Sequence, residues 1–191
     1  MCKVECKSVS RKLRALRASR ILKRGGCIAH ATATLPGIAA DSDNREAVQR
    51  LQRFKQRQGP FLLLADSIGT ALRQARYISP ALRRLVRASW PGPVTLIIPA
   101  KPGLHCACYK KSSMAIRVDS SEETRVLAKA CGGLLLSSSL NRRGQNTQLA
   151  DRRTQLRFAS FLSARLAGDS SSGKASQIIR VWRNGCTILR A

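Results

Sequence analysis

Acidic side chains are scarce in this chain of 191 residues, which has 10 Asp and Glu against 35 Lys and Arg. With so few carboxylates, the sequence shows no paired-carboxylate or Ser-His-Asp arrangement for acid–base or nucleophilic catalysis. A formal charge of +25 is tolerated most easily beside polyanions, so phosphate-bearing ligands are the first expectation. The alternative is a surface on which arginine is simply abundant, and charge alone does not separate the two.

Long apolar runs are absent and aromatic side chains are few. No stretch approaches the roughly 18 apolar residues of a membrane span. Residues 11–24 alternate charged and apolar side chains, unlike a secretory signal. We therefore expect no membrane association and a cytoplasmic location. Aromatic residues make up 4% of the chain, which argues against a platform for stacking the bases of single-stranded nucleic acid.

Cysteine is present but does not form a recognisable framework. The chain has seven cysteines, an odd number, and it is long enough to be stabilised by burial, so we expect reduced thiols. Cys2 with Cys6, and Cys106 with Cys108 beside His105, lack the usual two-residue spacing of zinc ligands and lie far apart in sequence. We expect no metal site from them.

The hydrophobic pattern alternates between helical and strand periodicity, which is typical of one α/β domain over residues 1–191. Predicted helices cover residues 8–23, 43–57, 67–75, 80–88, 120–130 and 151–166. Predicted strands cover residues 27–32, 61–65, 94–99, 114–118 and 134–136, with a hairpin over 177–189 turning at Asn184-Gly185. The Ser- and Gly-rich residues 168–173 are predicted to be flexible.

Three of these predictions are specific enough to be tested by a structure. In the first helix Val9, Leu13 and Leu16 recur at near-helical spacing, with Ile21 beyond them, which predicts an apolar inner face and a basic outer one. Asp43, followed by Glu46, is predicted to cap the second helix, and Ser120, followed by Glu123, the fifth. The third is the last helix, predicted to be continuous over residues 151–166.

Three clusters carry candidate chemistry. Lys55-Gln56-Arg57 ends a helix with two cations that could grip a polyphosphate, although such cations are ordinarily solvated helix caps. Residues 90–95 form a rigid Trp-Pro-Gly-Pro turn that enters a strand. Residues 137–141 place three serines and an asparagine after an apolar strand, at the strand end where α/β sheets bind ligands.

With Ala115-Ile116-Arg117-Val118, these clusters resemble, in the same order and at similar spacing, the YrdC/TsaC family of threonylcarbamoyl-adenylate synthases. Residues 37–41 resemble the family's Gly-rich strand exit and residues 173–179 its segment near the end. The match runs from about residue 21 to residue 190. It implies a twisted mixed sheet flanked by helices around a basic concave cavity.

The resemblance also implies site residues. A catalytic and phosphate-binding tetrad falls on Lys55, Arg57, Ser139 and Asn141. Further contacts to ATP fall on Thr95, Thr147 and Arg190. Contacts to L-threonine fall on Thr32, Arg117, Ser137 and Ser176, with Arg117 pairing with the carboxylate. His30 replaces a family aromatic and is expected to be packed rather than to act as a general base.

The implied reaction joins L-threonine, bicarbonate and ATP. The amine takes up carbon dioxide as a carbamate, which attacks the α-phosphorus of ATP and expels diphosphate. Such chemistry needs charge neutralisation and positioning more than a protein nucleophile. Mg²⁺ is expected to arrive with the nucleotide, because no acidic cage is visible. The implied partners are the transferase machinery and the tRNA that is modified next to the anticodon.

The chain departs from the family pattern in several places. Residues 31–37 lack the usual acidic and aromatic side chains, Gln58-Gly59-Pro60 replaces a basic or polar contact in a shortened loop, Leu140 replaces an alanine and Ala175 a proline. Two rival hypotheses stay open: a non-catalytic module for tRNA or double-stranded RNA, and a paralogue that makes another carbamoyl-adenylate. The retained tetrad argues against the first rival and does not address the second.

Overall fold

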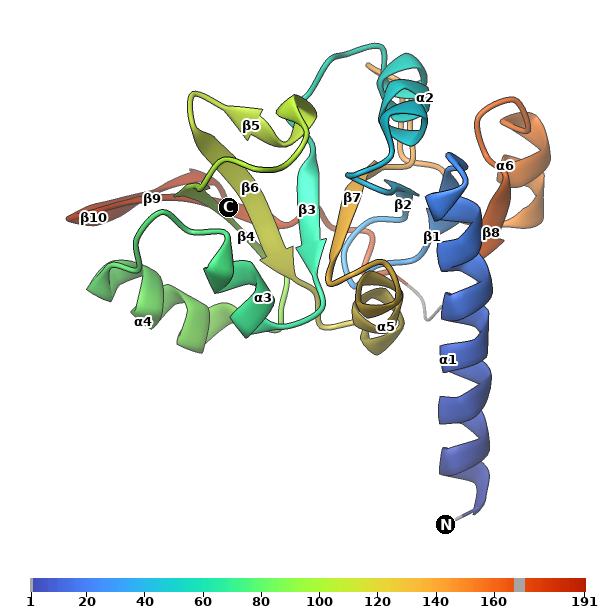
Figure 1. Cartoon of the computed structure of the whole chain (residues 1–191), viewed down its shortest axis with the longest axis horizontal. Coiled ribbons are helices and arrows are strands. Elements are labelled where there is room, and N and C mark those ends of the chain that lie inside the picture. The colour runs from blue at the N-terminus through green and yellow to red at the C-terminus, as the bar shows by residue number, and fades with distance from the viewer. Residues whose placement is uncertain (1, 167–170) are drawn as a thin grey trace.

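The computed structural model describes residues 2–166 and 171–191 of the chain (Figure 1). In this part of the chain, ten strands form one mixed sheet in the order β10-β9-β4-β6-β3-β7-β2-β1-β8, with β5 paired to β6. This arrangement confirms the α/β class and the mixed sheet flanked by helices. Among the described residues, no helix has both the length and the apolar character needed to span a membrane.

The elements follow one another along the chain with short connections. The strands are β1 (Ile28–His30), β2 (Gly37–Ala40), β3 (Leu62–Ala65), β4 (Val94–Pro99), β5 (Tyr109–Lys110), β6 (Ser113–Val118), β7 (Leu134–Ser139), β8 (Ala164–Leu166), β9 (Gln177–Trp182) and β10 (Gly185–Arg190). The helices are α1 (Cys2–Lys23), α2 (Arg45–Lys55), α3 (Ile68–Arg73), α4 (Pro80–Ser89), α5 (Glu122–Ala130) and α6 (Arg152–Arg157), with a 3₁₀ turn, η1 (Cys106–Cys108).

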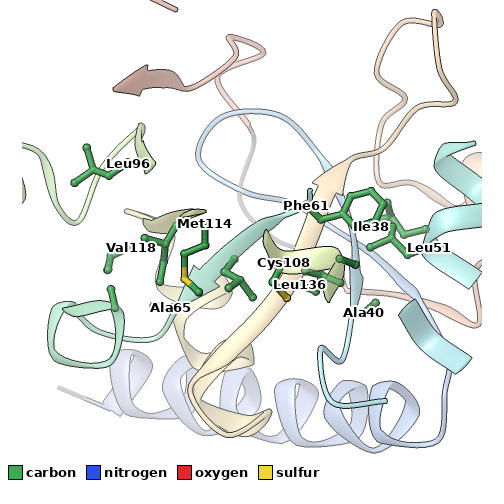
Figure 2. Close-up of a cluster of buried hydrophobic side chains, with 14 of the residues drawn as sticks. Ile38, Ala40, Leu51, Phe61, Ala65, Leu96, Cys108, Met114, Val118 and Leu136 are labelled. Carbon is green, nitrogen blue, oxygen red and sulfur yellow. The ribbon is translucent and has the colours of Figure 1, made fainter. Parts of the chain in front are cut away.

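One face of the sheet is covered by α2, α3 and α4 and forms the larger core. Figure 2 shows part of it, where Leu51 of α2 lies near Ile38 and Phe61, and Leu136 lies in the same cluster. These four side chains are at most 1% exposed. Burial of each such side chain stabilises the fold by about 1.5–3 kcal/mol relative to exposure. The result is a continuous apolar layer that fixes the register of the central strands.

The opposite face is covered only in part, by α1 and α5. Ala15, Ala18 and Leu22 of α1 pack with Leu127 of α5 and Leu135 of β7 in a second, smaller core. Figure 1 shows α1 running past this end of the sheet and projecting beyond it. Because side chains alternate between the two faces along a strand, the polar residues of β6 and β7 point to the uncovered half of this face. That half holds the candidate site.

The predicted first helix is confirmed, but its predicted orientation is wrong. Val9, Leu13 and Leu16 are exposed by 67%, 48% and 51%, so the stripe they form faces away from the sheet. The buried face uses alanines, which allow α1 to approach α5 closely. Ion pairs of Arg11 and Arg14 with Glu123 join the two helices there, with Nη2 of Arg14 lying 3.2 Å from the carboxylate.

Two predicted helix caps are wrong by one residue. Asn44, not Asp43, caps α2, because its side-chain oxygen accepts a hydrogen bond from the Ala47 amide at 3.1 Å. Ser121, not Ser120, caps α5 by accepting from the Thr124 amide. The predicted cap of α4 at Ser79 is confirmed. The predicted hairpin is also confirmed, but its turn residues are Arg183 and Asn184, one position earlier than predicted, because Gly185 already pairs with Trp182.

The predicted continuous helix over residues 151–166 is wrong. The helix ends at Arg157, and the chain then turns so that Phe158 and Leu162 enter the larger core. The Ser163 amide donates to the Cys27 carbonyl at 2.8 Å, after which β8 pairs in parallel with β1. Tertiary packing of these two side chains therefore overrides the helical periodicity. Of the segment predicted to be flexible, residues 168–170 lie outside the described residues.

Candidate active site

A cavity of about 210 Å³ lies on the sheet face that α1 and α5 cover only in part, in the half that these helices leave open. Strands β2, β3, β6 and β7 form its floor, and the C-terminal hairpin forms one wall. We call it the inner cavity, and its lining comprises Thr32, Thr34, Leu35, Gly37, Arg57, Leu62, Arg117, Ser137, Ser138, Ser139, Ser176 and Arg190. Three cations and several hydroxyl groups thus line this cavity. Its volume is smaller than the roughly 300–1,000 Å³ of pockets that bind larger ligands.

Arg117 is buried at the floor of the inner cavity. Its Nη2 lies 2.6 Å from a carboxylate oxygen of Asp119, and its Nη1 donates to the Thr34 hydroxyl at 2.8 Å. Asp119 also accepts from the backbone amides of Ala33 and Ser121. Burial lowers the pKa of the Arg117 guanidinium, while Asp119 acts in the opposite direction. Nε of Arg117 has no hydrogen-bond partner among the described residues, so one donor of the buried cation remains free.

His30 of β1 reaches across β2 to the same cavity. Its Nε2 lies 3.0 Å from the Ser137 hydroxyl, and the ring is 1% exposed. Gly37 lies between them in β2, and a Cβ at this position would lie 2.7 Å from that nitrogen. Burial lowers the pKa of His30 to about 4, so the imidazole is neutral at pH 7. The packed histidine therefore orients a cavity hydroxyl.

Thr32 lines the cavity, but its hydroxyl serves a local turn. It donates to the Leu35 carbonyl at 2.8 Å and accepts from the Thr34 amide at 3.2 Å. The amides of Ser172 and Gly173 donate to the carbonyls of Ala33 and Thr34, so this turn also holds the chain that leads to β9.

A third set of hydrogen-bonded polar side chains lies at the wall formed by the C-terminal hairpin. The Thr95 and Ser176 hydroxyls lie 2.9 Å apart, and Arg190 donates to the Ser176 carbonyl from Nε and Nη2 at 2.9 and 2.7 Å. Parallel pairing of β4 with β9 brings Thr95 opposite Ile178, which fixes this register. Residues nearly 100 positions apart are therefore joined at one wall.

Lys55, Ser139 and Asn141 form a tight cluster at the cavity mouth. The Lys55 ammonium donates to the Ser139 carbonyl at 2.9 Å, to the Asn141 side-chain oxygen at 2.8 Å and to the Asn141 carbonyl. The Ser139 hydroxyl donates to the same side-chain oxygen at 2.6 Å. Burial lowers the pKa of Lys55 to about 8, and the charge of Arg57 acts in the same direction.

A second cavity, of about 430 Å³, adjoins the first, and we call it the outer cavity. Its lining comprises Lys55, Arg57, Ser138, Ser139 and Arg143. Arg57 also lines the inner cavity; it donates to the Pro60 carbonyl at 2.7 Å and lies 4.5 Å above the Phe61 ring. Burial lowers the pKa of this guanidinium. A third cavity, with Lys110, Lys111 and Arg180, shares no lining residue with the inner one.

The structure brings together ten of the eleven residues that the sequence suggested. Eight of them line the inner or outer cavity, and Asn141 and Thr95 are hydrogen-bonded to residues that do. Thr147 is the exception, because it lines neither cavity and its side chain makes no hydrogen bond to another described residue. The sequence reasoning missed Thr34, Asp119 and Arg143. Asp119 could have been found from its position two residues after Arg117, whereas an isolated arginine among 35 basic residues gives no signal.

The cysteines do not gather into a metal site in the described part of the chain. Cys106 is exposed and Cys108 is buried in the larger core, where burial raises the pKa of its thiol to about 12. No three His, Cys, Asp or Glu side chains among the described residues lie close enough to hold a metal ion.

The fold and the polar cavity define a mixed α/β protein with a small-molecule site on one sheet face, and the chain belongs to the Sua5/YciO/YrdC family. That family model, described as "Telomere recombination", matches residues 20–191. The chain is 30% identical to the threonylcarbamoyl-AMP synthase of Halorhodospira halophila over 97% of its own length and 99% of that protein's. It is 35% identical to the synthase of Thiobacillus denitrificans over 64% of this chain and 67% of that one.

A solved structure agrees with the fold. P. abyssi Sua5 complexed with L-threonine superposes with a TM-score of 0.84 at 20% identity, covering 94% of this chain. The present chain spans 54% of that protein's length. At this level of identity the likeness shows the fold alone.

Proposed function

We propose that this chain is a threonylcarbamoyl-AMP synthase, which joins L-threonine, bicarbonate and ATP and releases diphosphate. The observation that carries the proposal is a pair of adjoining cavities that share Arg57 and Ser139. A reaction between an amino acid and a nucleotide needs two such compartments with a common boundary. The 30% sequence identity to a threonylcarbamoyl-AMP synthase, which extends over 97% of this chain, supports the same reaction.

The inner cavity suits the amino acid. Arg117 provides a positive charge for a carboxylate at the floor of the cavity, and Ser137, Ser176 and Thr32 line the same space. Asp119 pairs with Arg117, while Arg57 and Arg190 add positive charge without an acidic partner among the described residues, so the cavity favours a ligand that carries a carboxylate. L-Threonine, with one carboxylate, one amine and one hydroxyl, meets this requirement.

The outer cavity suits the phosphates. In the proposed reaction the amine of threonine takes up carbon dioxide as a carbamate. A carbamate oxygen then attacks the α-phosphorus and the bond to diphosphate breaks. We assign the tetrad of Lys55, Arg57, Ser139 and Asn141 to the boundary where these two reactants would meet. Arg57 and Ser139 would contact the reacting phosphate, the Lys55 ammonium would add positive charge, and Asn141 would hold Lys55 and Ser139 in place. Thr95, Thr147 and Arg190 are the further candidates for contact with the nucleotide.

Other components of the reaction follow from its chemistry. No carboxylate lines the inner or outer cavity in the described part of the chain, so Mg²⁺ would enter bound to the ATP phosphates. We place the reaction in the cytoplasm, in one domain formed by the whole chain. The adenylate would pass to transferase machinery that modifies tRNA.

The test is diphosphate release by purified protein supplied with ATP, Mg²⁺ and bicarbonate, with and without L-threonine. The expected result is release that depends on L-threonine, with L-valine as the matched control because it replaces the hydroxyl by a methyl group. Release with a different amine would point to a paralogue. ATP binding without release from any amine would contradict the synthase, and RNA binding without ATP binding would favour the non-catalytic module.

A further inference from the structure

The three hydrogen-bond donors of Lys55 are already used within the protein. Its ammonium, 5% exposed, bonds the Ser139 carbonyl and two oxygens of Asn141. A lysine ammonium has three N–H groups, so each phosphate contact would cost one of these bonds. Lys55 is therefore better placed to hold the segment after β7 than to grip a phosphate itself.

Asn141 passes this support on to a turn. While its side-chain oxygen accepts from Lys55 and Ser139, its amide nitrogen donates to the carbonyls of Gln145 at 2.6 Å and Arg142 at 3.1 Å. The Gln145 amide donates in turn to the Arg142 carbonyl at 3.1 Å. The cluster thus fixes the turn over residues 142–145.

The two arginines of this turn have different surroundings. Arg142 lies over Phe158 and Phe161, with its guanidinium carbon 5.9 and 5.4 Å from the ring centroids. Arg143 instead lines the outer cavity, as Arg57 does, and is exposed. Among the described residues no hydrogen bond or ion pair of the Arg143 guanidinium is found. Its five donors are therefore free for a ligand.

We propose that Arg143 binds the diphosphate part of the nucleotide, together with Arg57 in the outer cavity, and that Lys55 and Asn141 act as positioning residues for it. This inference rests on the proposed function. The expelled diphosphate must lie next to the amino acid, and only the outer cavity shares residues with the inner one; the third cavity shares none among the described residues. Paired guanidinium groups recognise phosphate oxygens bidentately.

The experiment measures binding of inorganic diphosphate, ATP and L-threonine to the wild-type protein and to three variants by calorimetry. Arg143→Ala should weaken diphosphate and ATP by about 10- to 100-fold, as expected for hydrogen bonds to charged groups. Arg143→Lys should lie between, because it keeps the charge and loses the planar fork. L-Threonine affinity should not change. Arg84→Ala removes an equal charge from the exposed face of α4 and is the matched control.

The outcomes separate this inference from the proposed function. Diphosphate affinity in Arg143→Ala equal to that of Arg84→Ala would overturn the role of Arg143, whatever the activity of the wild type. A wild type that binds diphosphate through Arg143 but shows no amine-dependent release would contradict the synthase and leave the phosphate site. If the wild type bound neither diphosphate nor ATP, both would be wrong. Thermal unfolding of each variant checks that the turn is intact.

Discussion

The inner and outer cavities are lined by different structural elements and differ in how their charged side chains are paired. The inner cavity is formed by strands, and its charged and polar groups are paired within the protein: Arg117 with Asp119, and His30 with Ser137. The outer cavity is lined by the end of α2, the last residues of β7 and a turn, and the side chains of Arg57 and Arg143 there are exposed. The buried Arg117 is therefore paired before a ligand arrives, whereas neither Arg57 nor Arg143 has an acidic partner among the described residues.

This difference indicates how the two substrates are selected. A prepaired cavity loses stability when one member of a pair is removed, and it admits only a ligand that matches the few donors left free. A cavity with unpaired cations is neutralised only by its ligand. Substitutions there should therefore alter the affinity for that ligand and the dependence of this affinity on salt concentration, rather than the stability of the fold.

The largest effect is expected from Asp119→Ala, which leaves the Arg117 cation buried and unpaired. Loss of one partner of a buried pair should lower the free energy of unfolding by about 3–5 kcal/mol. Chemical denaturation measures it. The control is Glu122→Ala, which removes the exposed partner of Arg11 and should cost no more than about 1 kcal/mol. Similar losses in the two variants would show that the inner pair is not special.

A second effect should appear as a loss of stability at acidic pH. The pKa of His30 is about 4 in the folded chain, against about 6.5 for a solvent-exposed histidine, so the unfolded state binds the proton first as the pH falls. The free energy of unfolding should therefore fall as the pH drops from about 6.5 to 4. The loss that this group causes approaches about 3 kcal/mol at the acidic end of that range. The difference in unfolding free energy between wild type and His30→Phe, followed over this range, isolates it. A pH-independent difference would argue against a neutral buried histidine.

Gly37→Ala should have a smaller effect, confined to the inner cavity. The added methyl would lie 2.7 Å from Nε2 of His30 and 3.0 Å from the Ser137 hydroxyl. Overpacking of this kind costs about 1–3 kcal/mol, and L-threonine binding should weaken while diphosphate binding is kept. Combining Gly37→Ala with His30→Ala should cost less than the sum of the two single changes. Strict additivity would show that the histidine is not what excludes the methyl.

The smallest effect should be a proton taken up at the outer cavity. The pKa of Lys55 is about 8 in the free protein, because burial disfavours the ammonium. The negative charge of a bound nucleotide raises that pKa, so ATP binding at pH 8.5 should take up part of a proton, and at pH 6.5 none through this group. Calorimetry in two buffers of different ionisation enthalpy measures the uptake. Equal heats in both buffers at pH 8.5 would contradict it.

Much of the fold could be predicted because its signals are local. The strands around Arg117 and Ser137 are short apolar runs with clear ends, and Ser79 with Pro80 marks a helix start unambiguously. The errors arose where packing competes with pattern. Alanines at positions 15 and 18 make a better inner face for α1 than the larger Leu13 and Leu16, because they bring the helix closer to its neighbours.

The site could be predicted as a set of residues but not as a set of contacts. The resemblance of the motifs to a known family implied that Lys55, Ser139 and Asn141 share a site, while nothing in the sequence shows that the donors of Lys55 are used up by the other two. Arg143 resembles every other exposed arginine until the turn that carries it is seen. The hydrogen bond from Arg117 to Thr34 joins distant segments of the chain. Neither segment has a local sequence pattern that would predict such a contact.

The sheet pairs segments that lie far apart along the chain, and this has a kinetic consequence. Strand β1 pairs with β8, and β4 pairs with β9, across separations of more than 80 residues. Chains dominated by such distant contacts fold slowly, because loops must close before the contacts that reward them form. The inner cavity draws on residues from Thr32 to Arg190, so it exists only once those pairings are complete. Recovery of ligand binding in the inner cavity during refolding should therefore mark the last cooperative step.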